Sequence, residues 1–504
     1  MSEVWKNFIG GEWVESRSGE TFERRNPATG EVVGTFTKSN AGDVDEAVAA
    51  ASKAFRSWRL VPAPKRGEIL YRTARILEER KNDLAREMTQ EMGKVFTEAA
   101  GDVQEAIDMT YYMAGEGRRM FGQTTPSELR NKFNMSVRKP LGVAGMITPW
   151  NFPMAIPSWK MTPALVAGNT IVFKPATYTP KLAIRFVEVL QEAGIPDGVV
   201  NLVIGSGPDV GDPLVSHPDV PLLSFTGSTE TGTRVATEAA KMNKRVTLEM
   251  GGKNAVIVMD DADLDLATEG ILWGAFGTTG QRCTATSRVV VHASVKQELE
   301  DRLAARASKM QLGDGLLEST DIGPIVSDSQ LQNVHNYIDI GRDEGARLVT
   351  GGEIRSEGEL GKGFFHEPTI FSDVSRDMRI ANEEIFGPVV SLIPVDGLDE
   401  AIDIANSVQY GLSAAIFTQN VNNAFRAMQD IYTGILYINA GTTGAEIHLP
   451  FGGTKGTGNG HREAGTAALD FYMEWQAIYV DYSGKLQRAQ IDTDKPLDEG
   501  QIAP

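Results

Sequence analysis

Short apolar segments alternate with helical segments from about Leu141 onward, and this alternation constrains the fold more than any other feature of the chain. Buried strands are predicted at residues 143–147, 170–173, 199–204, 222–226 and 245–248, and helices at residues 158–167, 180–193, 208–216 and 230–242. Repeated strand–helix units of this length indicate a parallel sheet with helical crossovers. We therefore expect a doubly wound α/β layer.

A second series of the same kind begins at Asn254. Its predicted elements are a strand at 255–259, a helix at 263–274, a strand at 287–292, a helix at 294–309 and later strands at 389–394, 413–417 and 434–438. Ahead of both series, Gly10-Gly11 predicts a two-residue hairpin, and residues 43–121 are predicted to be mainly helical with Asp43 as the first N-cap. The expected fold is α/β, with two doubly wound parallel-sheet lobes and a cleft between them.

The composition excludes several classes of function. A net charge of −18 over 504 residues opposes binding to nucleic acid or to anionic membranes, since both need a basic surface. No apolar run approaches the roughly 18 residues that span a bilayer, and we expect no signal peptide. A single cysteine gives no sign of an oxidising compartment. We expect an acidic cytoplasmic enzyme that binds neither nucleic acid nor membrane.

Cys283 is the only cysteine, so it cannot form an internal disulfide or a cysteine-rich metal site. It is a buried core residue, an incidental surface thiol or a nucleophile. Free cysteine is among the most buried residue types, which favours the first interpretation. The polar, glycine-bracketed segment Gly277-Thr-Thr-Gly-Gln-Arg-Cys-Thr284 favours the third, and a neighbouring cation or converging backbone N–H groups would promote the thiolate.

Two glycine-rich loops each follow a predicted strand and open a helix, at residues 205–211 and 225–232. The first has the spacing GxGxxxG, one residue longer than the dinucleotide fingerprint. Each loop alone is best explained as an ordinary tight turn. Two in succession at the carboxyl ends of strands favour a nucleotide site, because a helix N-terminus offers free N–H groups to a pyrophosphate.

Two further residues lie in segments that suit catalysis. Asn151 lies in Pro149-Trp-Asn-Phe-Pro153 after a strand, where it is either part of a turn or a rigid amide donor for a developing oxyanion. Glu249 precedes Gly251-Gly252 at a strand end, where it is either a solvated carboxylate or a general base. The acidic run 260–265 lacks the glycine and glutamate of an EF-hand, so it is predicted to begin a helix, and no metal site is predicted.

Seven short motifs resemble the aldehyde dehydrogenase superfamily, and they occur in the family's order. They are Pro-Trp-Asn-Phe-Pro (149–153), Phe-Lys-Pro-Ala (173–176), Phe-Thr-Gly-Ser (225–228), Leu-Glu-Met-Gly-Gly-Lys (248–253), Gly-Gln-Arg-Cys (280–283), Glu-Glu-Ile-Phe-Gly-Pro (383–388) and Pro-Phe-Gly-Gly (450–453). The resemblance implies that Cys283 attacks an aldehyde as a thiolate, and that Asn151 and the Cys283 backbone hold the oxyanion. Glu249 would then activate water to hydrolyse the thioester.

The resemblance also implies a bound NAD or NADP. Lys174 matches the residue at the adenosine ribose, and Glu384 and Phe386 match residues at the nicotinamide ribose and ring. The other implied cofactor-binding positions are Thr148, Pro149, Trp150, Thr177, Gly207, Gly211, Gly227, Ser228, Gly232 and Gly251. Members that prefer NAD usually carry Glu where this chain has Thr177, three residues after the ribose lysine. Because an uncharged residue does not repel a 2′-phosphate, NADP is expected to be accepted unless other contacts still favour NAD.

Two other functions stand beside hydrolytic aldehyde oxidation. A CoA-acylating branch of the superfamily typically lacks the general-base glutamate, so Glu249 argues against it. A non-catalytic protein on the same fold is opposed by the intact set of Cys283, Glu249 and Asn151. The loop 442–450 resembles that of members acting on semialdehydes of dicarboxylic acids, such as 2-oxoglutarate semialdehyde, and His448 is either a contact for the substrate carboxylate or a structural histidine.

The family architecture implies a division of the chain. Residues 1–121 and 141–251 would form the cofactor-binding domain, residues 252–456 the catalytic domain, residues 122–140 with 472–481 a small β element for oligomerisation, and residues 482–504 a tail. The end of the tail is expected to be poorly ordered. A homodimer or homotetramer is expected, with a small-molecule aldehyde as the substrate.

Overall fold

A seven-stranded sheet lies at the centre of the first lobe in the computed structural model, which describes residues 4–491. Its strands, in the spatial order β12-β11-β8-β9-β10-β2-β3, are β12 (Arg245–Glu249), β11 (Leu222–Thr226), β8 (Val143–Ile147), β9 (Thr170–Lys174), β10 (Val200–Leu202), β2 (Asn7–Ile9) and β3 (Glu12–Val14). Strands β8 to β12 run parallel, and the winding direction reverses between β8 and β11. In such sheets ligands bind at the strand ends beside this reversal.

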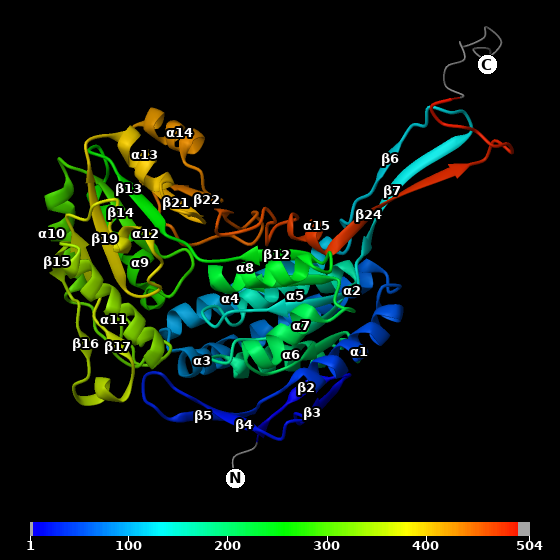
Figure 1. Cartoon of the computed structure of the whole chain (residues 1–504), viewed down its shortest axis with the longest axis horizontal. Coiled ribbons are helices and arrows are strands. Elements are labelled where there is room, and N and C mark those ends of the chain that lie inside the picture. Colours follow the sequence, from blue (N-terminus) through cyan, green and yellow to red (C-terminus); the bar gives the residue numbers. More distant parts are fainter. Residues whose placement is uncertain (1–3, 492–504) are drawn as a thin grey trace, which may run out of the picture.

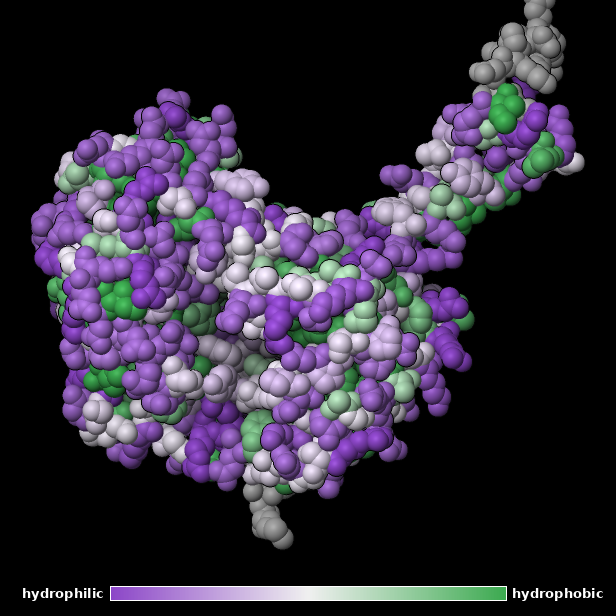
Figure 2. Space-filling model, viewed as in Figure 1, coloured by the Kyte–Doolittle hydropathy of each residue, from purple (hydrophilic) through white to green (hydrophobic). Residues whose placement is uncertain are grey.

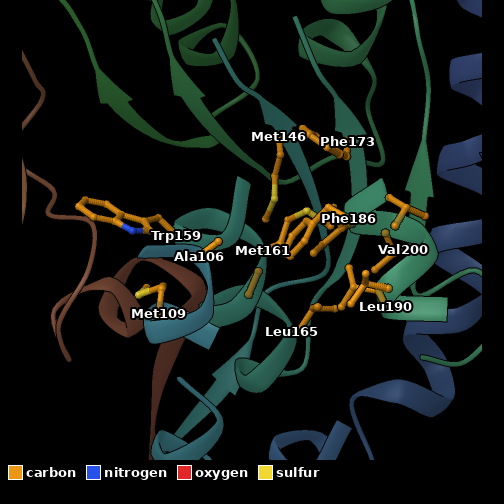
Figure 3. Close-up of a cluster of buried hydrophobic side chains, with 14 of the residues drawn as sticks. Ala106, Met109, Met146, Trp159, Met161, Leu165, Phe173, Phe186, Leu190 and Val200 are labelled. Carbon is orange, nitrogen blue, oxygen red and sulfur yellow. The ribbon is translucent and has the colours of Figure 1, made fainter. Parts of the chain in front are cut away.

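Both faces of this sheet are buried under helices. The helices of the first lobe are α1 (Ala41–Trp58), α2 (Ala63–Glu79), α3 (Lys81–Met92), α4 (Phe96–Glu116), α5 (Ala155–Ala167), α6 (Pro180–Glu192), α7 (Asp212–Ser216) and α8 (Thr229–Ala240). Alternate residues of β9 belong to different cores, because successive strand side chains point to opposite faces. Phe173 packs in the cluster of Figure 3, whereas Val172 packs in the cluster on the other face. This two-sided burial explains why the strands are continuously apolar.

The second lobe repeats this architecture. Its sheet has the order β15-β18-β19-β14-β13-β21-β22, with β15 (Arg347–Thr350), β18 (Thr369–Ser372), β19 (Val389–Val395), β14 (Thr286–His292), β13 (Asn254–Val258), β21 (Ser413–Phe417) and β22 (Ile435–Ile438). All neighbours are parallel except β15 and β18. The covering helices are α9 (Leu264–Phe276), α10 (Lys296–Ala307), α11 (Asp328–Asp343), α12 (Arg379–Asn382), α13 (Leu398–Asn406) and α14 (Val421–Asp430). The predicted α/β fold with two doubly wound sheets is confirmed.

A three-stranded sheet projects as an arm from the first lobe, on the side away from the second lobe (Figure 1). It consists of β6 (Gln123–Thr125), β7 (Lys132–Pro140) and β24 (Met473–Asp481), and α15 (Ala468–Tyr472) leads into it. β24 pairs antiparallel with β7 along its whole length, from Met473 opposite Pro140 to Asp481 opposite Lys132. Its function in oligomerisation remains a prediction.

Three minor sheets complete the β-sheet structure of residues 4–491. They are β1 (Val4–Trp5) with β5 (Val32–Thr37) and β4 (Thr21–Arg25), β16 (Ile354–Arg355) with β17 (Phe365–His366), and β20 (Tyr410–Gly411) with β23 (Thr454–Lys455). No helix in this range is long and apolar enough to cross a membrane. The prediction for the end of the tail falls on residues 492–504, which lie outside the described residues.

One local prediction was wrong, and a second was right only in part. Asn40, not Asp43, is the N-cap of α1: its side chain accepts the Gly42 N–H at 2.9 Å, while Asp43 accepts the Asn40 N–H at 2.9 Å in a capping box. The helix predicted at 208–216 is a π-helical turn, η1 (Gly207–Gly211), followed by the short α7. Proline at positions 208 and 213 supplies no backbone N–H, which disfavours one regular α-helix there. By contrast, Asp263 begins α9 as predicted for the acidic run.

Candidate active site

Two cavities meet at Cys283. One, of about 320 Å³, lies beside the carboxyl ends of β8 and β11, and the other, of about 310 Å³, is lined partly by α4 and α5. The residues that line both cavities are Ile156, Thr226, Met250 and Cys283. The thiol is therefore neither a core filler nor an incidental surface group, because it is partly accessible at the junction of two concave sites.

The turn before Cys283 has an unusual backbone. In η2 (Gly277–Gly280), Thr278 has φ 52° and Thr279 has φ 57°, a left-handed conformation that is strained for β-branched residues. Glu98 of α4 holds this turn, since its two carboxylate oxygens accept the Thr278 N–H at 2.8 and 2.9 Å. The strain is thus balanced by a buried contact from the other lobe.

The neighbouring cation does not stabilise a Cys283 thiolate. Arg282 donates to Glu98 at 3.0 Å, and its guanidinium lies 4.6 Å from the centre of the Trp273 ring. Burial, and after it the nearby carboxylates of Glu384 and Glu249, together raise the pKa of the Cys283 thiol to about 12. The expected promotion of the thiolate by the adjacent arginine is therefore absent from this arrangement.

Asn151 follows the carboxyl end of β8 and is buried. Its Nδ2 donates to the Gln281 carbonyl at 3.1 Å, which ties β8 to the turn that carries Cys283. A side-chain amide has two N–H groups, so a second hydrogen remains for another acceptor. The position suits an oxyanion donor beside the thiol.

Glu249 ends β12 and lies on the cavity lined by α4 and α5. It is 3% exposed, and neither of its carboxyl oxygens has a hydrogen-bond partner among residues 4–491. Burial and the neighbouring Glu463 raise its pKa well above the usual range. Glu463 itself pairs with the buried Lys160, which also donates to Ser224 at 2.9 Å. The solvated carboxylate considered from the sequence is excluded, and the buried, unpaired carboxyl suits proton transfer.

The cavity beside β8 and β11 gathers about half of the predicted cofactor residues. Those on its wall are Pro149, Trp150, Gly227, Ser228, Gly251, Glu384 and Phe386. The Gly252 N–H donates to Glu384 at 2.9 Å, and Trp150 meets Phe386 edge-on with ring centres 5.5 Å apart. Gln330, which the sequence did not point to, donates to the Phe386 carbonyl at 2.9 Å and supports this wall.

The remaining predicted cofactor residues lie outside that cavity. They are Thr148, Lys174, Thr177, Gly207, Gly211 and Gly232. Lys174 ends β9, donates to the Pro175 carbonyl at 3.0 Å, and has a pKa that burial lowers to about 8. Gly232 lies inside α8, where a Cβ atom would collide with Met250, so its absence of a side chain permits close packing.

The second cavity contains residues that motif analysis missed. Its wall includes Glu105, Trp159, Trp273 and Glu463, none of which belongs to the seven motifs; it also includes Phe451 of the Pro-Phe-Gly-Gly motif, for which the sequence predicted no role. They could not be found by spacing, because they come from α4, α5, α9 and the segment after β22.

His448 does not join this cavity. Its side chain is 53% exposed and lies 3.3 Å from Glu446, whereas Thr443, Gly444 and Ala445 of the same loop do line the wall. Of the two interpretations of this histidine, the structure does not support a contact with the substrate carboxylate. Among residues 4–491, no three His, Cys, Asp or Glu side chains are grouped to hold a metal ion.

Comparisons with known proteins agree with this geometry. Residues 13–478 match the model of the aldehyde dehydrogenase family. The chain is 45% identical to an alpha-ketoglutaric semialdehyde dehydrogenase of Bacillus subtilis (strain 168), over 95% of this chain and 98% of the relative. It is 44% identical to an alpha-ketoglutarate semialdehyde dehydrogenase of Haloferax volcanii, over 96% and 100%. Its structure resembles a betaine aldehyde dehydrogenase of Staphylococcus aureus in complex with NAD+, with a TM-score of 0.93, 36% identity and coverage of 96% and 95%. The chain belongs to the aldehyde dehydrogenase family.

Proposed function

We propose that Cys283, Asn151 and Glu249 oxidise an aldehyde to a carboxylic acid with NAD or NADP. The observation that carries this proposal is the meeting of two cavities at the only thiol, with Asn151 tied to its turn and Glu249 on the wall of one cavity. One cavity suits the cofactor and the other suits the aldehyde. An arrangement of nucleophile, oxyanion donor and base is what acyl transfer through a covalent intermediate requires.

The chemistry follows from the three groups. The Cys283 thiolate forms a bond to the aldehyde carbon, and the former carbonyl oxygen takes over the negative charge, held by the Asn151 amide and the Cys283 N–H. When bound in the other cavity, a nicotinamide would supply the hydride acceptor for oxidation of this adduct to a thioester. Glu249 then takes a proton from water, the hydroxide adds to the thioester carbon, and the carbon–sulfur bond breaks to release the acid and the thiolate.

The residues present fit a dinucleotide. Ser228 is the N-cap of α8, whose free backbone N–H groups face the end of β11 and suit a pyrophosphate. We propose that Lys174 and Thr177 contact the adenosine ribose, with Gly207 and Gly211 beside the adenine, and that Glu384 and Phe386 contact the nicotinamide end. Since Thr177 carries no charge, we propose that NADP is accepted as well as NAD.

The substrate proposed is a semialdehyde of a dicarboxylic acid. Support comes from the two relatives named as alpha-ketoglutarate semialdehyde dehydrogenases and from Thr443, Gly444 and Ala445, which line the cavity from the loop that resembles such members. We also propose a cytoplasmic location from the acidic composition, and the domain boundaries given above from the two separate sheets.

The test is a spectrophotometric screen of aldehydes with NAD and NADP separately, without CoA. We expect NAD(P)H to form with a semialdehyde and Cys283→Ala to abolish it while cofactor binding stays nearly intact. A requirement for CoA would favour the acylating alternative, and no NAD(P)H with any aldehyde would favour a non-catalytic protein. A kcat/KM more than tenfold higher with NAD than with NADP would contradict the proposal for Thr177.

A further inference from the structure

The wall of the substrate-side cavity carries several acidic side chains, and most of them are already paired. Glu98 lies 3.0 Å from Arg282, and Asp102 lies 2.9 Å from the buried Lys94. Glu463 is paired with Lys160. Each of these carboxylates is already paired with a cation, so none is available to bind a charged group of the substrate.

Apart from the proposed base Glu249, Glu105 is the acidic side chain on this wall that has no paired cation. It lies on α4 one turn after Asp102, is half-buried and lines the same cavity as Cys283. No hydrogen-bond or ion-pair partner is found for it among residues 4–491. The charged and titratable groups that act on it are Asp102 and Asp108 from α4, and Lys94 and Arg282 from the segments packed against α4. It in turn acts on Cys283 and on Tyr437 of β22.

Other polar groups without partners accompany Glu105. The Thr443 hydroxyl and the Trp159 indole Nε1 both belong to residues on the cavity wall, both are shielded from solvent, and neither has a hydrogen-bond partner in the described chain. Buried polar atoms without partners are rare in folded proteins and indicate a missing ligand or water. An indole N–H can only donate a hydrogen bond, so this part of the wall suits a ligand group that accepts hydrogen bonds.

The protonation state of Glu105 decides what it can bind. Burial raises its pKa to about 8, so at pH 7 the group is mostly a neutral carboxylic acid with an O–H to donate. As the pH rises above about 8, it loses this proton and becomes an acceptor only. A hydrogen bond from a carboxylic acid to a carboxylate is among the short, strong ones, whereas two carboxylates repel each other.

We propose that Glu105, as a neutral acid, donates a hydrogen bond to the carboxylate of the semialdehyde substrate and thereby selects it over unsubstituted aldehydes. This inference rests on the proposed function and assigns the far end of the substrate to the wall formed by Glu105, Thr443 and Trp159. Glu105 is a specificity-determining residue and takes no part in bond making at the aldehyde carbon.

The experiment compares succinic semialdehyde with butanal, which have the same chain length and differ in the terminal carboxylate. The readout is the ratio of their kcat/KM values between pH 6.5 and 9.5, because the titrations of Cys283 and Glu249 affect both substrates and cancel. For the wild type, the ratio is expected to favour the semialdehyde at pH 7 and to fall by up to about tenfold per pH unit above 8.

Variants separate the hydrogen bond from the charge. Glu105→Gln keeps a donor that does not titrate, so its ratio should stay flat with pH. Glu105→Leu removes the donor, and its ratio at pH 7 should fall by about ten- to a hundredfold. Glu79→Gln is the matched control, because Glu79 is exposed on α2, lies outside the cavity and is not among the charged groups that act on Glu105, so its ratio should follow the wild type.

Three results would overturn the proposal: no preference for succinic semialdehyde in the wild type at pH 7, an unchanged ratio in Glu105→Leu, or the wild-type pH profile in Glu105→Gln. Oxidation of butanal in the same assays would show that the proposed function survives such a failure. If no aldehyde is oxidised, calorimetric binding of succinate and of butyramide, which has the same chain length but no carboxylate, decides the question without turnover. Tighter succinate binding that weakens above pH 8 and depends on Glu105 supports the site, and equal binding refutes it.

Discussion

Cys283 is held in a state that does not favour reaction. Burial and the carboxylates of Glu384 and Glu249 place its pKa at about 12, whereas the thiolate is the nucleophilic form. Burial raises the pKa of Glu384 to about 7, so above that pH its negative charge opposes ionisation of the thiol. Any group that removes this charge or places a positive charge nearby will lower the thiol pKa.

Glu384→Gln is therefore expected to accelerate alkylation of Cys283. The neutral amide removes a repulsive charge, the thiol pKa falls, and the rate with iodoacetamide at pH 8.5 should rise by at least about threefold. Below pH 6 the two proteins should converge, because Glu384 is then protonated in the wild type. With one cysteine in the chain, the alkylated fraction by mass spectrometry measures this site alone. Glu383→Gln is the control, since the Glu383 carboxylate accepts a hydrogen bond from the Tyr337 hydroxyl at 2.8 Å. Equal alkylation rates for the two variants would contradict the predicted effect of the Glu384 charge.

At the scale of the element, the turn η2 depends on one side chain from another lobe. Glu98 accepts the Thr278 N–H and the Arg282 guanidinium, and both members of that ion pair are nearly inaccessible. Two threonines in the left-handed region need such support, because the conformation costs free energy by itself. Glu98 is thus a positioning residue for the nucleophile.

Glu98→Gln is expected to loosen this turn. The amide keeps one hydrogen-bond acceptor, but its NH2 group places a second donor against the Thr278 N–H and the Arg282 guanidinium. This mismatch should lower the free energy of unfolding, measured with denaturant, by about 1–3 kcal/mol. We expect kcat to fall by at least about tenfold while the affinity for NAD, measured by fluorescence titration, changes little. Glu68→Gln is the control, since Glu68 forms an exposed pair with Lys65 on α2, and its unfolding midpoint should not move. An unaltered kcat in Glu98→Gln would remove the positioning role.

At the scale of the whole molecule, the arm is not covered by the rest of residues 4–491. β24 is an edge strand of the arm, so one of its edges has no strand partner among these residues. Trp475 is 53% exposed and Tyr479 is 66% exposed, and apolar side chains lie among polar ones on the arm in Figure 2. An exposed edge strand with aromatic residues is prone to pair with another chain.

We expect a homodimer or homotetramer held in part through this arm. Tyr479→Asp should shift the mass measured by light scattering toward the monomer, because it places a charge in the contact. Leu317→Asp is the control, since Leu317 is 59% exposed and lies between α10 and α11 of the second lobe, whereas the arm projects from the first lobe. A single species of 54.7 kDa for the wild type would refute the assembly.

The two doubly wound sheets were predictable because parallel strands buried on both faces leave continuous apolar runs in the sequence. The hairpin at Gly10-Gly11 and the acidic start of α9 were predictable because they depend on local backbone chemistry. Local rules failed at Asn40, where two neighbouring cap residues compete, and at η1, where prolines interrupt a helical pattern.

The candidate site divides in the same way. Short motifs were enough to identify Cys283, Asn151 and Glu249 as candidate site residues, because each motif sets the local backbone around one functional group. The sequence alone determined that the chain forms two largely parallel α/β sheets. It also identified a thiol, an amide and a carboxylate as candidates for one catalytic site. Only the tertiary structure decided that Arg282 turns toward Glu98, that Glu98 supports η2, and that Glu105 is left unpaired in a cavity. Those outcomes depend on residues about 180 positions apart in the chain, whose burial and charge are undefined until the lobes pack together.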